Sequence, residues 1–140
     1  MADAPAEYLK PLPVPTKEDR PFWEALSEHR FILPQCTECG QVWFPPYLNC
    51  VDCLSLAREW IDASGTGVVD AVTVFEKPYL SSFTPDLPYN VCLIKLDEGP
   101  RLYSNLVNIA NDEIRVGMSV RIVFDDVKAG VTLPRFEPAQ

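Results

Sequence analysis

Two CxxC pairs constrain the fold of this 140-residue chain more than any other feature. Cys36 and Cys39 form the first pair, Cys50 and Cys53 form the second, and residues 40–49 separate them. Each pair can present two thiolates on one tight knuckle, so the four sulfurs together can make a tetrahedral metal site. Gly40 follows the first pair directly and suits the unusual backbone conformation that a knuckle needs.

Zinc is the metal predicted for this site, because it favours four thiolates and undergoes no redox chemistry. Four cysteine ligands leave no open position for water, which indicates a structural ion. Iron in a rubredoxin-like site, a redox-active pair and a ribbon that has lost its metal are the alternatives, and metal analysis of fresh protein distinguishes them. The fifth cysteine, Cys92, lies in an apolar run and is expected to be a buried core residue.

The charge balance limits the partners of the chain. Twenty acidic residues against twelve basic ones give a net charge of −8. Nucleic acids and anionic membranes are bound largely through Lys and Arg, so neither is expected as a partner. The chain has no run of about 18 apolar residues, and its acidic, Pro-rich N-terminus lacks the features of a signal peptide. We therefore expect a cytoplasmic protein, in which paired cysteines more often bind metal than form disulfides.

Prolines dominate the N-terminal segment, at Pro5, Pro11, Pro13 and Pro15. Because proline cannot continue a helix or a central strand, residues 1–18 are expected to form an extended arm. The arm is either a floppy tail or a segment that wraps a partner. Its apolar anchors on a partner would be Tyr8, Leu9, Leu12 and Val14.

A short helix is expected after the arm, within the segment 19–60 that also holds the ribbon. Asp19 or Thr16 can cap its N-terminus. Apolar side chains at helical spacing form one aromatic stripe: Phe22, Trp23 and Leu26. Such a stripe must dock on its own domain or on a partner. Two basic residues at the C-terminal end suit the helix dipole, namely His29 and Arg30.

Short alternating strands fill the remaining segment, 61–140. The strands are expected at 68–75, 89–96, 101–107, 119–124 and 131–136, with a long loop at 78–88 and one helical turn within 108–116. Five short strands with turn signals between them predict a mainly β chain, in which an OB-fold barrel follows the helix and the ribbon. An open sandwich is the rival architecture.

Groups that could carry catalysis are sparse. The sequence has no GxSxG, GxGxxG or GxxxxGK[ST] motif. His29 is the single histidine and could act as a base, although capping or surface exposure is the default interpretation. Acidic pairs such as Asp97-Glu98 fall in predicted turns, where solvated carboxylates are expected. The chain is therefore interpreted as a binding or assembly module.

These features, in this order, resemble the DUF35 family, whose members combine a rubredoxin-like zinc ribbon with an OB-fold. The resemblance runs from about Arg20 to Ala139. It rests on the pattern CxxCGxxxFPP at 36–46, on the segment SGTGVVDAVTVF at 64–75 and on the turn LDEGPRL at 96–102. Cys36, Cys39, Cys50 and Cys53 match the metal ligands of the family directly.

The resemblance implies a noncatalytic, zinc-binding accessory subunit of an acyl-CoA-processing complex. The partner is expected to be a thiolase-type enzyme that cleaves a β-oxoacyl-CoA, in a hetero-oligomer with two copies of each subunit. The CoA thioester would be a shared substrate, bound mostly by the partner. A MaoC-like hydratase or a retro-aldolase is the alternative partner. A free-standing acyl-CoA-binding module and a single-stranded nucleic-acid binder are rival functions, and the charge of −8 opposes the latter.

Two sets of residues are candidates for contacts beyond the metal. The aromatic and proline side chains expected on the partner surface are Phe22, Trp23, Phe44, Pro45 and Pro46. The other interpretation of the aromatic ones is that they seal the small core around the ribbon. The cations available for CoA phosphates are Lys77, Arg101, Arg115 and Arg121, each of which could equally be an ordinary surface charge.

Overall fold

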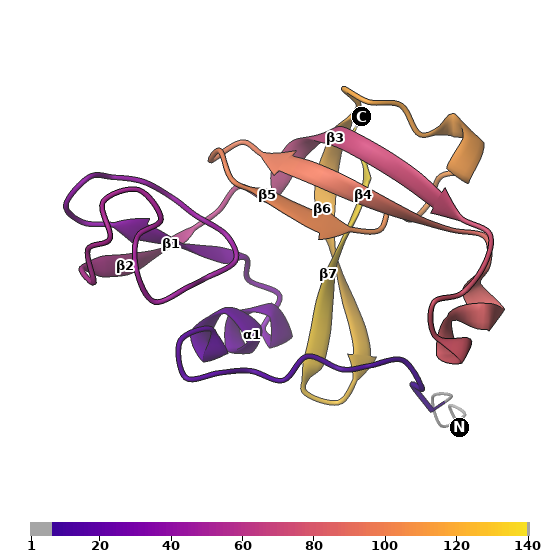
Figure 1. Cartoon of the computed structure of the whole chain (residues 1–140), viewed down its shortest axis with the longest axis horizontal. Helices are drawn as coiled ribbons and strands as arrows, with labels where there is room; N and C mark the ends of the chain where they lie inside the picture. Colours follow the sequence, from indigo (N-terminus) through magenta and orange to yellow (C-terminus); the bar gives the residue numbers. More distant parts are fainter. Residues whose placement is uncertain (1–6, 140) are drawn as a thin grey trace.

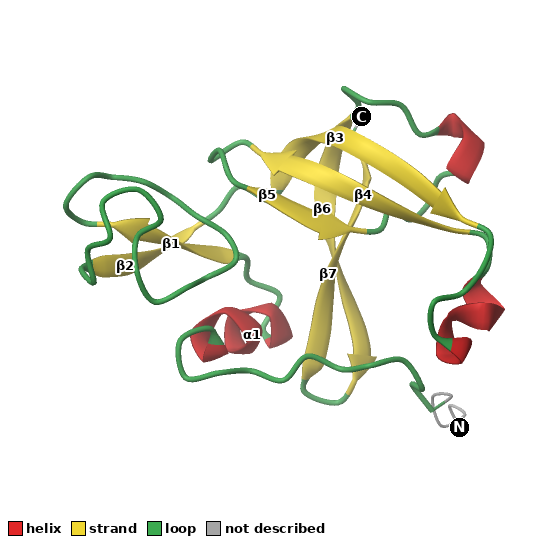
Figure 2. Ribbon diagram, in the orientation of Figure 1, coloured by secondary structure: helices red, strands yellow, loops and turns green. Residues whose placement is uncertain are grey.

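A computed structural model describes residues 7–139 of the chain. The beginning of the arm, with Pro5, and the last residue lie outside the described residues. The chain is mainly β, with one α-helix near the N-terminus and two sheets (Figure 1 and Figure 2). No helix within 7–139 is long and apolar enough to cross a membrane.

The smaller sheet belongs to the ribbon. It pairs β1 (Ile32–Cys36) antiparallel with β2 (Arg58–Asp62), and the cysteine knuckles lie between the two strands in sequence. Neither strand was expected from the sequence. The residues of β1 are buried on both faces and include Pro34, so the segment shows no alternation of apolar and polar residues.

The larger sheet has the strand order β5-β4-β3-β6-β7. Its strands are β3 (Thr66–Phe75), β4 (Tyr89–Leu96), β5 (Arg101–Ser104), β6 (Ser119–Lys128) and β7 (Val131–Pro138). The sheet curls so that Leu106, just beyond β5, pairs with Phe136 of β7. All neighbouring strands are antiparallel. This half-closed sheet confirms the predicted fold class, a mainly β chain with an OB-fold after the ribbon.

One of the two connecting segments of the barrel differs from expectation. The expected loop 78–88 contains a 3₁₀ helix, η1 (Ser81–Asp86), whose Phe83 ring packs against Tyr89 at 5.5 Å between centroids. The sequence of η1 has a low helix propensity, includes Pro85 and shows no helical pattern of apolar residues. The 3₁₀ helix is therefore evident only from its packing in the structure. The turn expected within 108–116 is present as η2 (Asn111–Glu113).

Helix α1 (Arg20–Ser27) is the short helix expected after the arm. Asp19 stands at the N-cap, but its carboxylate accepts the N–H of Thr16 at 2.6 Å in place of a helix N–H. The helix ends because His29 adopts a left-handed φ of 58°. The N–H groups of His29 and Arg30 then donate to carbonyls of the last turn, at 2.9 Å each. Both basic residues therefore lie beyond the helix, which corrects their expected place within it.

The side chain of His29 lies on the barrel surface. Its imidazole stacks on Phe124 at 5.1 Å, and Nε2 lies 3.0 Å from Oδ1 of Asp126. The Thr132 hydroxyl donates to the same carboxylate at 2.6 Å. The hydrogen bond from Thr132, and then that from His29, lower the pKa of Asp126 below its ordinary 3.8.

A depressed pKa in the folded state makes the stability depend on acid pH. The contribution of Asp126 is present above its unfolded pKa and is lost as the pH falls through the lowered folded pKa. Asp126→Asn should therefore flatten the fall in the free energy of unfolding below about pH 4, as measured by urea denaturation at a series of pH values. Thr132→Val should act in the same direction, and two profiles identical to wild type would contradict the assignment.

One hydrophobic core joins the helix, the ribbon and the barrel. Phe22 and Leu26 of α1 belong to the same buried cluster as Leu33 of the ribbon and Val120 of the barrel. The other buried members are Phe31, Val69, Cys92, Ile94, Leu96, Leu102, Leu106, Ile114 and Phe136. Cys92 is fully buried, and this burial raises the pKa of its thiol. The expectation of a core cysteine is thus confirmed.

The turn between β4 and β5 holds the short linker that joins the ribbon to the barrel. A carboxylate oxygen of Glu98 accepts the N–H of Ser64 at 2.7 Å. Asp97 donates its N–H to the carbonyl of Thr66 at 3.0 Å, and its carboxylate accepts the Thr66 hydroxyl. These two acidic residues therefore have defined partners, while Asp97 is also exposed to solvent as expected.

The described part of the arm is extended and lies alongside α1 and the β6–β7 hairpin (Figure 1). Lys10 Nζ lies 2.6 Å from Asp86 of η1 and also faces the rings of Tyr8 and Phe83. Leu9 and Val14 remain exposed. The arm is thus tied to its own barrel at Lys10, while a role of its apolar residues on a partner stays a prediction.

Candidate metal centre

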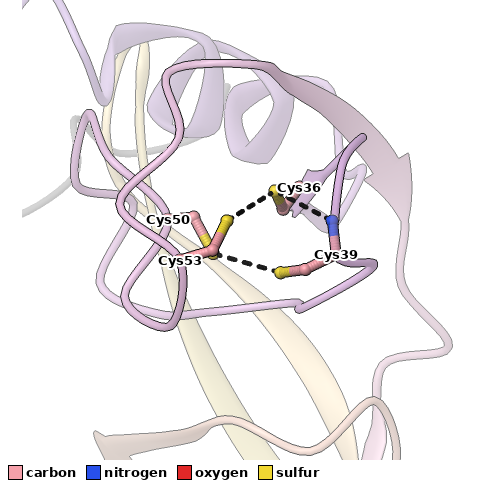
Figure 3. Close-up of side chains that lie close together, drawn as sticks. All are labelled: Cys36, Cys39, Cys50 and Cys53. Carbon is pink, nitrogen blue, oxygen red and sulfur yellow. Dashed lines mark hydrogen bonds between the residues drawn. The ribbon is translucent and has the colours of Figure 1, made fainter.

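Four cysteine side chains converge between the two knuckles of the ribbon. Figure 3 shows that they point toward one another. Their sulfurs all lie within 4.8 Å of one another. The shortest separations are 3.6 Å between Cys36 and Cys53 and 3.5 Å between Cys39 and Cys50. The structure therefore brings together the four residues that the sequence singled out.

The sulfur geometry fits a tetrahedral ion. A Zn–S bond of about 2.3 Å places the four sulfurs of a tetrahedron about 3.8 Å apart. The observed separations, from 3.5 Å up to at most 4.8 Å, bracket that value. The donors are four thiols with no carboxylate or imidazole among them, which is the set that zinc or rubredoxin-type iron prefers.

Electrostatics within the cluster also favours a bound cation. The N–H of Cys39 donates to the sulfur of Cys36 at 3.4 Å, which lowers the pKa of Cys36 to about 7. The N–H of Gln41 has the same effect on Cys39, but partial desolvation and the neighbouring thiols outweigh it and raise the pKa of Cys39 to about 12. Crowded thiolates repel one another, and a divalent cation removes that conflict.

The two knuckles share a backbone design. Gly40 and Leu54 each follow the second cysteine of a pair, and both adopt a left-handed φ, of 82° and 64°. Their N–H groups donate to the carbonyls of Cys36 and Cys50, at 3.0 and 3.1 Å. The expected role of Gly40 is confirmed. The leucine in the equivalent position of the second knuckle was not singled out from the sequence.

The four candidate ligands differ in their exposure to solvent. Cys36 and Cys50 are buried and pack with Trp43 in a small cluster of their own. Cys39 and Cys53 face solvent. The Trp43 indole N–H donates to the carbonyl of Tyr47 at 3.2 Å. Sequence reasoning missed Trp43, although an aromatic residue between two cysteine pairs is a usable signal for the core of so small a unit.

The residues expected on a partner surface occupy different environments. Phe22 is only 1% exposed and Pro46 is buried, so both pack within their own chain. Trp23 and Phe44 are half-buried against the core, and Pro45 is exposed. For Phe22 this burial favours the interpretation in which the ring seals the core. A partner role for the other three stays a prediction.

The barrel carries a groove of 660 Å³ beside the arm. Its walls include the rings of Tyr8, Phe83, Tyr89 and Tyr103. The two cations that line it are already paired: Lys10 with Asp86, and Arg135 with Asp125 at 3.2 Å. The groove is thus aromatic with its positive charges neutralised.

The cations considered for CoA phosphates come from separate elements and mostly have partners. Arg101 lies 2.7 Å from Asp70, and Arg121 lies 2.8 Å from Glu137. Arg115 donates to the carbonyl of Asp112 at 2.6 Å. Lys77 is exposed beyond the end of β3. The structure therefore gives these four side chains no common phosphate site.

Two family descriptions match the two parts of the chain. Residues 23–57 match the rubredoxin-like zinc ribbon domain of ChsH2, and residues 60–125 match the C-terminal OB-fold domain of ChsH2.

Curated relatives and a solved structure agree with this division. A "DUF35 domain-containing scaffold protein" of Methanothermobacter thermautotrophicus is 33% identical over 67% of this chain and 71% of its own length. A "Probable enoyl-CoA hydratase alpha subunit" of Thermomonospora curvata is 35% identical over 94% of this chain, which spans only 40% of that relative. The solved "Ltp2-ChsH2(DUF35) aldolase" contains a chain that matches with 34% identity and a TM-score of 0.82, over 91% of this chain and 99% of that one. The protein is therefore a member of the DUF35 family, with a ChsH2-type zinc ribbon followed by an OB-fold.

Proposed function

We propose that this chain is a noncatalytic, zinc-binding accessory subunit of an acyl-CoA-processing complex. The observation that carries the proposal is the match to nearly the whole of one chain of the Ltp2-ChsH2(DUF35) aldolase. The partner proposed first is a thiolase-type enzyme that cleaves a carbon–carbon bond of a β-oxoacyl-CoA. The aldolase name of the matched structure supports carbon–carbon cleavage.

Within that complex, Cys36, Cys39, Cys50 and Cys53 would bind the zinc ion. Bound there, zinc neutralises the thiolates and fixes the two knuckles; it supplies no Lewis-acid step, because four sulfurs complete its coordination. Free and exposed cysteines such as Cys39 and Cys53 favour a reducing compartment, which is consistent with the cytoplasm. The CoA thioester is proposed to bind mostly on the partner, since the cations of the barrel are largely paired within their own chain.

A MaoC-like hydratase is the second candidate partner. The relative named as an enoyl-CoA hydratase alpha subunit favours a hydratase partner. This chain matches 40% of that longer protein. In either case the accessory role of the DUF35 chain is the same, and the partner provides the reactive groups.

Co-purification tests the proposal. The tagged chain is co-expressed with a thiolase-like subunit and, separately, with a MaoC-like subunit from the same organism. One of the two should elute with the chain as a single species containing two copies of each subunit, as measured by light scattering. Separate elution in both cases, with each partner fully active and soluble alone, would contradict the proposal. Calorimetry with CoA on the isolated chain should show weak binding or none; tight binding would support the free-standing module.

A further inference from the structure

Large apolar side chains gather on the outside of the second knuckle. Of the ten residues 47–56, five are exposed large hydrophobic ones: Tyr47, Leu48, Val51, Leu54 and Leu56. We refer to these five as the knuckle patch. Exposed apolar residues that occur singly are ordinary, whereas a concentration of them marks an interaction surface. The short turn that carries them is compact, because Leu54 donates its N–H to Cys50 at 3.1 Å and Cys50 donates to Ser55 at 2.9 Å.

Leu54 is unfavourable for the isolated chain in two respects, its exposure and its backbone conformation. This indicates that its side chain has a function. It is 72% exposed, and its φ of 64° lies in the left-handed region that a Cβ disfavours. The equivalent position of the first knuckle is Gly40, so the knuckle geometry itself needs no side chain there. Backbone strain held at an exposed apolar residue points to a contact outside the chain.

The surroundings of the knuckle patch specify the chemistry of what covers it. Charged residues make up 23% of the whole chain, but the 21 residues 37–57 include only Glu38 and Asp52. Depletion of charge is typical of the core of a protein interface. Both of these charges are negative, whereas Arg58, the next residue along the chain, donates to the carbonyl of Tyr47 at 3.0 Å. A zinc ion with four thiolates would add two further negative charges, so the net charge around the patch would be negative. A complementary surface is therefore apolar at its centre and basic at its rim.

The patch also continues toward the barrel. Val51 borders a groove of 510 Å³ whose other walls include Phe44 of the ribbon and Pro100 of the β4–β5 turn. A partner seated on the knuckle patch could thus extend along this groove. Phe44 would then join the contact from the side, whereas the buried Phe22 would not.

We infer that the knuckle patch is the surface that binds the acyl-CoA enzyme subunit, through an apolar face with a Lys- and Arg-rich rim on that subunit. This inference rests on the proposed function and deepens it: the partner contact lies on residues 47–56, separate from the aromatic stripe of α1. Zinc supports the contact by holding the knuckle rigid, which lowers the conformational entropy lost on binding.

The test removes the apolar groups while retaining the fold. Leu54→Asn and Leu56→Asn are combined in one variant, because asparagine tolerates a left-handed φ. Val116→Asn on the barrel is the matched control, with 65% exposure against 64% for Leu56. The double variant should retain one zinc per chain and unfold at or above the wild-type temperature. Its affinity for the subunit that co-purifies with the wild-type chain should fall at least about tenfold, while Val116→Asn should leave the affinity unchanged. Titration calorimetry measures both.

The outcomes separate this inference from the proposed function. If the wild-type chain binds its partner and the double variant binds equally well, the inference is wrong and the proposed function stands. If the wild-type chain binds neither enzyme subunit, both fail together. Sedimentation of the free wild-type chain should show a monomer. A dimer that the double variant dissociates would assign the knuckle patch to a second copy of this chain and overturn the inference.

Discussion

Removal of the metal ion is expected to unfold the ribbon and leave Trp43 exposed to water. Structural zinc contributes about 10–16 kcal/mol of binding energy in small zinc modules, which equals or exceeds the stability of a whole domain at about 5–15 kcal/mol. Trp43 packs with Cys36 and Cys50, and Trp60 lies in β2 of the same ribbon, so the tryptophan emission of the chain, to which Trp23 also contributes, reports the loss. Mass spectrometry should find one zinc per chain before treatment with a chelator, and emission should shift to longer wavelength after it.

Single cysteine variants localise the effect. Cys50→Ser should lose the metal and the near-ultraviolet circular dichroism of Trp43, since Cys50 is a fully buried member of the cluster. Cys92→Ala is the control, because Cys92 is equally buried but lies in the barrel. It should retain one zinc per chain. Zinc and iron both absent from freshly purified protein would be incompatible with the proposed site, and a visible absorption band would identify iron.

Truncation of Phe22 is expected to produce the second largest effect, a loss of about 3–5 kcal/mol for Phe22→Ala. The ring is 1% exposed. It contacts Trp23, Phe31 and Phe44 at centroid distances of 5.2, 6.1 and 5.4 Å, so it joins the helix, the start of the ribbon and the ribbon loop. Its removal leaves a cavity at the point where all three meet. Urea denaturation of the isolated chain measures the loss.

The same variant separates the two interpretations of the aromatic stripe. If Phe22 seals the core, Phe22→Ala destabilises the isolated chain, and Phe22→Leu, which keeps most of the apolar volume, costs much less. If instead the isolated chain kept its stability while partner binding disappeared, Phe22 would belong to the interface.

The metal centre could be predicted from the sequence because its ligands are close together along the chain. Two short spacings, Cys36 to Cys39 and Cys50 to Cys53, bring the sulfurs together with little help from the rest of the fold. Strand β4 was predicted with its observed ends, Tyr89–Leu96, because an apolar run is bounded by proline and by a turn. In both cases neighbouring residues suffice to define the structure.

Features that depend on distant contacts escaped prediction. The pairing of β1 with β2 joins segments more than twenty residues apart, and neither segment alternates in polarity. Whether Phe22 faces a partner or the core depends on Phe44, which lies in another element. The left-handed Leu54 has no signature of its own, since leucine is not a residue that marks such a turn.

The hydrogen bond that the linker between ribbon and barrel donates to Glu98 has a consequence for assembly. The linker is held at Ser64, and one buried cluster contains residues of both the ribbon and the barrel, so we expect little hinge motion between the two parts. An enzyme that binds the ribbon would therefore also determine the position of the barrel and its aromatic groove. No further contact would be needed to orient the barrel. We therefore expect the position of the ribbon on a partner to set the position of the barrel.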